Sequence, residues 1–151
     1  MKKKIIYVVI AIAVVAVLAI GFQIFPKTLT FDFESNPISS AFFTYDEDPA
    51  DSYERTHYTP NQAQINELES RLTSLSGARK VKEISEAHTI ASIGIILDNG
   101  ESLNFQGKDD GTLQLICRPS EEVYHINDKE FHRYLINVCS GGDRASATEV
   151  E

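Results

Sequence analysis

The longest apolar run of the chain comes at its N-terminal end, ahead of several shorter patterned segments. Residues 5–25 contain no charged side chain, and a helix of this length spans roughly 30 Å, the hydrocarbon thickness of a bilayer. Lysines fill positions 2–4, whereas Lys27 alone follows the run closely. By the positive-inside rule, this distribution predicts a cytoplasmic basic end at residues 1–4, a transmembrane signal-anchor helix at residues 5–25 and an extracytoplasmic domain at the cell membrane.

A cleaved signal peptide is the alternative interpretation of the same segment. A basic end followed by an apolar run fits both, and Ala19 and Gly21 are small residues at the spacing of a cleavage site. The run is longer than the usual apolar region of a signal peptide, and no polar region precedes that site, which favours the uncleaved anchor. Both interpretations place the following domain on the outer side of the membrane.

The next segment shows the period of two that is typical of β-strands. Phe31 and Phe33 alternate with acidic residues, and residues 41–45 form an aromatic run that favours a strand. Residues 46–51 are mostly acidic and contain a proline, so a turn or loop is expected there. A short third strand is expected within residues 53–58.

A helix is indicated over residues 60–76 by signals at both ends and by an apolar stripe. Thr59 is a candidate N-cap, Pro60 suits the first helical position, and Gln62 completes a capping-box spacing. Gly77 is the expected residue just beyond the C-terminal end. The stripe has spacings of three and four residues and consists of Ile65, Leu68, Leu72 and Leu75.

Four further strands and a second helix are expected in the C-terminal half. Residues 88–97 are rich in isoleucine, and the Asn-Gly pair at residues 99–100 predicts a tight hairpin turn after them. Shorter strand patterns follow at residues 102–106, 112–117 and 123–126. Asn127 and Glu130 make a second capping box, which precedes a stripe formed by Phe131, Tyr134, Leu135 and Val138.

These elements predict an α+β fold in which an antiparallel meander sheet carries two helices packed on one face. One transmembrane helix is expected to precede it. The domain is expected at residues 28–139, which is long enough for a separate hydrophobic core. Residues 140–151 contain glycine, small polar residues and no apolar period, so a disordered tail is expected there.

Charge divides the chain in the same way as hydropathy. The chain of 151 residues has a net charge of −8, yet residues 1–27 carry four lysines and no acid. Residues 28–151 therefore carry −12, from ten basic and 22 acidic side chains. Such an acidic domain argues against nucleic acid as a partner, because phosphates require a basic surface.

The two cysteines of the chain raise the question of a disulfide. Cys117 ends a predicted strand on its apolar face, and Cys139 lies at the edge of the second helix stripe. Disulfides persist in extracytoplasmic compartments, and this bridge would stabilise the fold by roughly 3 kcal/mol in the chain-entropy model. The sequence leaves a bridge and two separate thiols as open alternatives.

The acidic residues Asp46, Asp48 and Asp51 form a candidate cation site. They fail the EF-hand pattern, because position six counted from Asp46 is not glycine and position twelve is not glutamate. A looser site and a solvated acidic loop are the two alternatives. The four histidines form no close ligand pair, and no phosphate loop or serine nucleophile motif is present, so no other metal site, cofactor or catalytic residue is predicted.

Aromatic residues are concentrated at the start of the predicted domain. Phe42, Phe43, Tyr45 and Tyr53 are candidates for a partner-binding edge, since aromatic side chains anchor interfaces. A place in the core is the alternative role for the same residues. Residues 31–54 contain seven acids and no base, so an interface here would favour a basic protein or peptide.

The lysines after Met1, the capped helix from Thr59 and the segment at residues 131–135 give a layout that resembles small single-span proteins of Gram-positive bacteria. Those proteins carry one extracytoplasmic α+β domain of unassigned role, so the resemblance assigns no functional residue. The anchor, the acidic domain and the lack of a catalytic motif favour a membrane-anchored binding or accessory domain. An anchored hydrolase and a secreted inhibitor or immunity-type protein are the alternatives.

Overall fold

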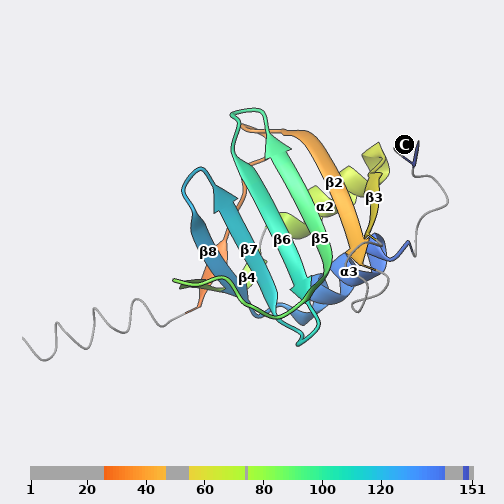
Figure 1. Ribbon diagram of the computed structural model, residues 1–151. Helices are drawn as coiled ribbons and strands as arrows, with labels where there is room; N and C mark the ends of the chain where they lie inside the picture. Colours follow the sequence, from red (N-terminus) through yellow and green to blue (C-terminus); the bar gives the residue numbers. More distant parts are fainter. Residues whose placement is uncertain (1–25, 47–54, 74, 142–147, 150–151) are drawn as a thin grey trace, which may run out of the picture.

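Figure 1 shows the computed structural model, which describes residues 26–46, 55–73, 75–141 and 148–149. Within these residues, nine strands form one sheet in which every neighbouring pair is antiparallel. In chain order the strands are β1 (Lys27–Leu29), β2 (Ile38–Asp46), β3 (Arg55–Thr59), β4 (Leu75–Val81), β5 (Thr89–Leu97), β6 (Ser102–Lys108), β7 (Leu113–Arg118), β8 (Glu122–Ile126) and β9 (Thr148–Glu149).

The centre of the sheet is a meander of four consecutive strands, β5 to β8. The order across the sheet is β1-β4-β8-β7-β6-β5-β2-β3-β9, so two strands that precede the meander in the chain, β4 and β2, flank it on its two sides. Helix α2 (Gln62–Leu72) connects β3 near one edge to β4 near the other. This crossover carries the chain past the width of the meander and covers part of one face.

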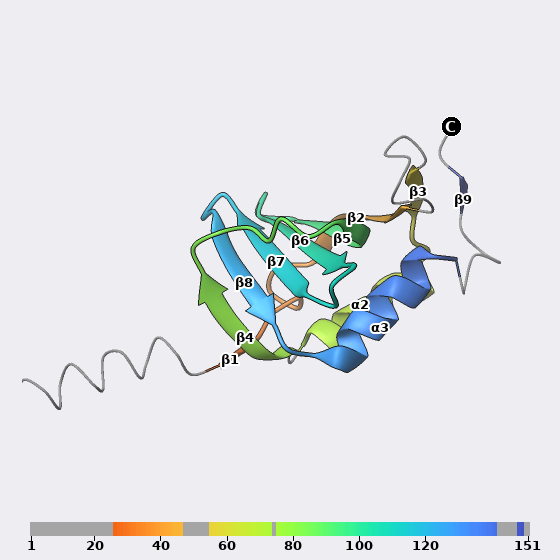
Figure 2. The same cartoon turned by 60° about the horizontal axis from the view of Figure 1, so that its bottom comes forward.

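Both helices lie on the same face of the sheet, as the turned view in Figure 2 shows. Helix α3 (Lys129–Cys139) buries four side chains, those of Phe131, Leu135, Val138 and Cys139. Helix α2 contributes Leu68 and Leu72 to the same hydrophobic core. We call the side that the helices cover the inner face of the sheet, and the opposite side the open face.

The core lies between the helices and the inner face. Phe105 of β6 has no exposed surface, and its ring makes a T-shaped contact with Phe131 at a centroid distance of 5.3 Å. Helix α3 approaches β6 so closely that a Cβ on Gly107 would lie 3.0 Å from Cδ2 of the buried Leu135. Each large apolar side chain buried in this way contributes roughly 1.5–3 kcal/mol to stability.

The helices begin at other residues than the sequence spacing predicts. Asn61 rather than Thr59 caps α2: its Oδ1 accepts the Gln64 N–H at 3.0 Å, and Gln64 Oε1 accepts the Asn61 N–H at 2.9 Å. Asp128 rather than Asn127 caps α3, and its side chain accepts two N–H groups of the first turn. Because neighbouring residues offer the same capping chemistry, spacing alone did not identify the residue that caps.

The first helix is also shorter than its apolar stripe suggests. It ends at Leu72 and β4 begins at Leu75, so the last residue of the stripe belongs to a strand. Gly77 lies within β4 rather than just past the helix, and its φ is +74°. A Cβ there would lie 2.9 Å from the carbonyl oxygen of Asn127, so glycine permits the close approach of this backbone to the start of α3.

The predicted fold class is wrong. The sequence predicts a meander sheet behind a transmembrane helix, whereas the described residues form a wider, entirely antiparallel sheet with two short helices. Across residues 26–46, 55–73, 75–141 and 148–149, no helix is long and apolar enough to cross a membrane. The predicted basic end (1–4) and span (5–25) lie outside the described residues.

Two further segments differ from expectation. The alternation at residues 31–34 is not part of a strand, because a turn begins there and Asp32 Oδ1 accepts the Ser35 N–H at 3.1 Å. Phe31 instead packs its ring on Phe105 from outside the sheet, at a centroid distance of 6.3 Å. In the expected tail, Thr148–Glu149 form β9 beside β3, while residues 142–147 and 150–151 lie outside the described residues.

Candidate functional site on the open face of the sheet

Side chains on the open face form two parallel rows that cross the central strands. Strand registry places four residues of β2, β5, β6 and β7 side by side in one row, which we call the aromatic row: Phe42, Gly94, Asn104 and Ile116. A second row runs from β3 to β8, and we call it the polar row: His57, Thr44, Ser92, Gln106, Gln114 and His125. Neither helix covers this face of the sheet, which is turned toward the viewer in Figure 1.

The aromatic row is built around the ring of Phe42. This ring lies directly on the backbone of Gly94, where an added Cβ would be only 2.0 Å from Phe42 Cζ. Phe42 is 43% exposed, and Ile96 nearby is 40% exposed. Together with Ile116 and Arg118, these residues border a groove of about 260 Å³. The result is an exposed aromatic anchor beside a shallow hollow.

The polar row provides neutral hydrogen-bonding groups beside that groove. Thr44 Oγ1 lies 3.0 Å from His57 Nδ1, and both residues border a second hollow of about 220 Å³ with Ser92. Asn104 and Gln106 border both hollows, so the two form one continuous surface. Asn104 Oδ1 is buried and has no hydrogen-bond partner among the described residues.

Exposed negative charge is missing from this surface, although the chain is acidic overall. Among the strand residues on the open face in the described part of the chain, Asp46 is the one acid, and its side chain is 2% exposed. His88 Nε2 lies 3.0 Å from Asp46 Oδ2. Lys108 is also buried and donates to Thr89 Oγ1 at 2.7 Å, and burial lowers the pKa of its amine. The exposed part of the two hollows therefore carries no acid, and Arg118 and His57 are the basic residues on its border.

The four aromatic residues proposed from the sequence do not form one cluster. Phe42 lies on the open face, whereas Phe43 points to the inner face and is completely buried. Tyr45 is half-buried against the core on the inner face, and Tyr53 lies outside the described residues. Because successive side chains of a strand point to opposite faces, only one of the two neighbouring phenylalanines was available for binding.

Of the two alternatives that the sequence leaves open for the cysteines, the disulfide is the wrong one, because Cys117 and Cys139 are both free. Cys139 lies at the end of α3, and its Sγ is 3.4 Å from the backbone oxygen of Ser92 in β5. Cys117 lies in β7, two strands from β5, a lateral distance of about 10 Å that no disulfide bridges. Burial raises the pKa of Cys117 to about 11 and that of Cys139 to about 12, so both thiols stay protonated at neutral pH.

The candidate cation site is described at only one of its three residues. Asp46 is buried at the end of β2 and faces His88, while Asp48 and Asp51 lie outside the described residues. Within the described ranges, no group of three acidic, histidine or cysteine side chains has a geometry suited to a metal ion.

A larger hollow of about 450 Å³ lies beside the N-terminal half of α3, and its border includes Lys129, His132 and Arg133. Its border is formed by α3, the turns beside it and the buried ends of β7 and β8 at Leu113 and Ile126. Asp128 already caps the first turn of α3 through its Oδ1. The open face differs because residues from four neighbouring strands converge there around one exposed ring. We therefore take the open face as the candidate site.

Sequence reasoning missed most of this surface. Ser102, Asn104 and Gln106 alternate with apolar residues along β6, which indicates a polar face but not a binding face. Ile116 and Arg118 carry no motif at all. Their common position depends on which strands become neighbours, and that information is absent from local pattern.

Comparison of the chain with protein-family models, with curated proteins and with solved structures finds no match. A functional assignment for the open face therefore rests on its geometry and chemistry.

Proposed function

We propose that this domain binds an oligosaccharide of neutral sugars on the open face of its sheet, and that it is a binding domain rather than an enzyme. The observation that carries the proposal is the exposed Phe42 ring beside uncharged amide and hydroxyl side chains, in a chain with a net charge of −8. Neutral ligands suit such a surface because binding leaves no buried charge without a partner.

The Phe42 ring supplies the apolar part of the recognition. The face of an aromatic ring carries partial negative charge, so it attracts the weakly positive C–H groups on one side of a sugar ring. The other side of the Phe42 ring packs on the backbone of Gly94, because glycine has no Cβ that would occupy this space. A ring fixed in this way loses little conformational freedom when a ligand stacks on it.

The amide and hydroxyl groups supply the polar part. Sugar hydroxyls both donate and accept hydrogen bonds, and so do the side chains of Thr44, Ser92, Asn104 and Gln106. These four residues come from three adjacent strands and border the two connected hollows. A few placed polar groups around an apolar contact are typical of small-molecule sites.

Two predictions from the sequence stay untested beside this proposal. An extracytoplasmic location, where surface polysaccharides are found, still rests on the charge and hydropathy of residues 1–27. A basic protein or peptide as partner rests on the acidic stretch that includes residues 47–54, which lie outside the described residues.

Isothermal titration calorimetry of the full chain with chitotetraose, cellotetraose and maltotetraose tests the proposal. We expect measurable binding of at least one of these neutral tetrasaccharides, weakened about tenfold or more by Phe42→Ala, as is typical for loss of an aromatic anchor. Phe33→Ala is the matched control, because Phe33 is also a partly exposed phenylalanine but borders neither hollow.

Two outcomes of this titration would contradict the proposal. Binding that survives Phe42→Ala unchanged would place the ligand elsewhere. If all three tetrasaccharides fail to bind while a lysine-rich peptide binds, the proposed ligand chemistry is wrong and the acidic partner surface takes its place.

A further inference from the structure

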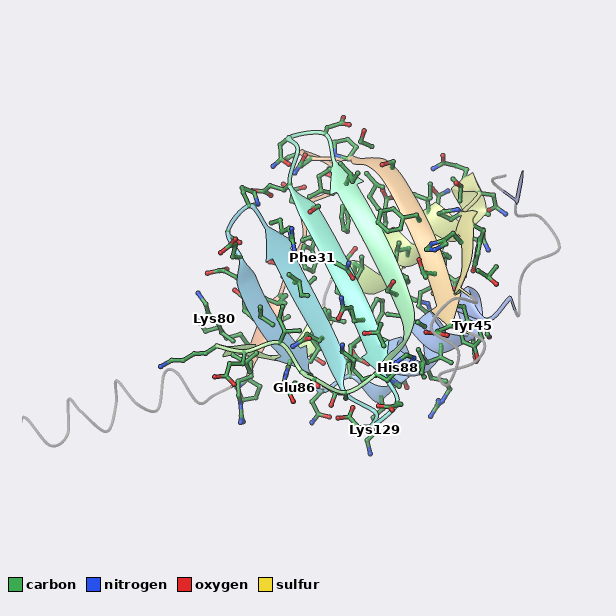
Figure 3. All side chains as sticks on the ribbon, in the orientation of Figure 1. Phe31, Tyr45, Lys80, Glu86, His88 and Lys129 are labelled. Carbon is green, nitrogen blue, oxygen red and sulfur yellow. The ribbon has the colours of Figure 1, made fainter. Side chains whose placement is uncertain are left out.

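The chain between β4 and β5, residues 82–88, crosses the open face instead of turning at its edge. We call this segment the strap. In Figure 1 it passes in front of the lower ends of the central strands, and in Figure 2 it lies on the side of the sheet opposite the helices. Figure 3 shows Glu86 and His88 along it. The strap thus covers one end of the polar row and leaves the other end open.

Few contacts hold the strap to the sheet. The Ser85 N–H donates to Gln114 Oε1 at a long 3.3 Å, and His88 Nε2 lies 3.0 Å from Asp46 Oδ2. The backbone oxygen of His88 accepts the Asp109 N–H at 3.0 Å. The strap forms neither helix nor strand, and its Ile84 is 53% exposed rather than packed. Segments with so few buried contacts open locally at low free energy.

Two polar groups beneath or beside the strap have no partner. Gln114 has no exposed surface, and its Nε2 makes no hydrogen bond among the described residues. The Nε2 atom of His125, its neighbour across β7 and β8, is buried and without a hydrogen bond in the same part of the structure. Buried polar groups without a hydrogen bond are rare and destabilising. We therefore expect each of these two groups to form a hydrogen bond with a bound ligand.

Gln114 and His125 continue the polar row that begins at His57 and Thr44. Gln106, which borders the open hollow, pairs directly with Gln114 on the neighbouring strand. The covered and uncovered groups therefore lie on one straight path across the sheet, and the strap divides it.

We infer that the strap covers a second ligand subsite, formed by Gln114 and His125, and that it opens locally to extend the groove for a longer neutral oligosaccharide. The inference rests on the proposed function for the nature of the ligand, but the opening of the strap is a property of the free protein. In the closed state the Gln114 amide is half satisfied by the strap backbone. In the open state the oxygen and the nitrogen of the Gln114 amide and the His125 ring are all available to sugar hydroxyls.

Thiol labelling measures the opening directly. In a Gln114→Cys variant, N-ethylmaleimide reacts at position 114 only when the strap is displaced, and peptide mass spectrometry locates the label. Cys139 is the internal reference, because it has no exposed surface and lies in the core under the other face, where labelling requires global unfolding. We expect labelling at position 114 to be at least about tenfold faster than at Cys139.

Equal rates at the two positions would overturn the inference, because the strap would then open only with the whole domain. A variant that fails to fold is recognised by rapid labelling of Cys139, and His125→Cys then replaces it. Adding His88→Ala, which removes the contact to Asp46, is expected to speed labelling at position 114 several-fold and leave Cys139 unchanged. The matched control is His132→Ala, a histidine in α3; no difference between the two would contradict the role of His88 in holding the strap.

A further arm separates the subsite from the proposed function. If a tetrasaccharide binds the wild-type chain, it is expected to slow labelling of position 114, and unchanged labelling would overturn the subsite. If no tetrasaccharide binds, the proposed function fails, while labelling without ligand still decides whether the strap opens.

Discussion

The inner and open faces of the same sheet show how one set of strands serves two purposes. Along β6, Leu103 and Phe105 point inward and are almost fully buried, whereas Asn104 and Gln106 point outward and border hollows. Among the described residues, two helices pack on the inner face, and the strap lies on the open face. Stability is therefore concentrated on one side of the sheet, and the other side is available for recognition.

The difference also explains the distribution of charge. The side chains that pack on the inner face are apolar. The acidic side chains are concentrated instead at turns and on the helix surfaces. Asp109 and Asp110 in the β6–β7 turn are exposed examples, and the Thr112 N–H, which donates to Asp110, lowers the pKa of that carboxyl. An acidic periphery around a neutral open face disfavours anionic ligands at long range without affecting neutral ones.

Truncation of a core side chain tests the inner face and has the largest expected effect. Leu135→Ala removes a fully buried side chain between α3 and β6, and we expect a loss of about 2–5 kcal/mol in the free energy of unfolding. Ile96→Ala, at a residue that is 40% exposed on the open face, is expected to cost under about 1 kcal/mol. Urea denaturation followed by circular dichroism measures both. Equal losses would contradict the assignment of stability to one face.

The junction between the sheet and α3 is tested by two glycines with the same backbone requirement. Gly77 and Gly100 have φ of +74° and +84°, so alanine is strained at either. A Cβ at Gly77 also meets Asn127 O at 2.9 Å, while Gly100 has open space around it. We expect Gly100→Ala to cost about 1 kcal/mol and Gly77→Ala about 1–3 kcal/mol more. Thermal unfolding compares them, and a difference near zero would mean that the backbone at Asn127 yields easily.

Local signals in the sequence located most strands and both helices but not their arrangement. The periodicity of residues 88–97 and the Asn-Gly turn after them correspond to β5 and its hairpin with β6. Nothing local indicates that β2 pairs with β5 or that β4 pairs with β8, because such pairings join residues far apart in the chain. The stripe of the first helix continued into Leu75 since a buried strand residue has the same apolarity as a buried helix residue.

The sequence predicted one residue of the candidate site, Phe42, from its aromatic character and not from the strands that surround it. Its aromatic neighbours Phe43 and Tyr45 support the core instead, because alternation along β2 sends them to the inner face or toward its margin. Asn104, Ile116 and Gln114 become a surface only after the meander has formed. The apolar run at residues 5–25 dominated the sequence interpretation, yet the open face depends on none of it.

Substitution of Gly94 has the smallest expected effect on stability and the sharpest effect on the proposed site. A Cβ at this position would lie 2.0–2.6 Å from three atoms of the Phe42 ring, so the ring must move. The ring is 43% exposed and free to swing outward, and alanine is the better strand residue, by roughly 0.5–1 kcal/mol. We expect the free energy of unfolding of Gly94→Ala to stay within about 1 kcal/mol of the wild type.

Binding is expected to respond quite differently, because a displaced Phe42 ring no longer presents its face beside the groove. Calorimetric titration with the tetrasaccharide that binds the wild type is expected to show a loss comparable to that of Phe42→Ala. In the double variant the second substitution should add nothing, since both act through the same ring. Additive losses would show that Gly94 contributes through the backbone itself, and full affinity in Gly94→Ala would show that the ring position is irrelevant to recognition. If Gly94→Ala keeps the stability of the wild type but loses affinity, a single added methyl group changes recognition on the open face without weakening the core on the inner face.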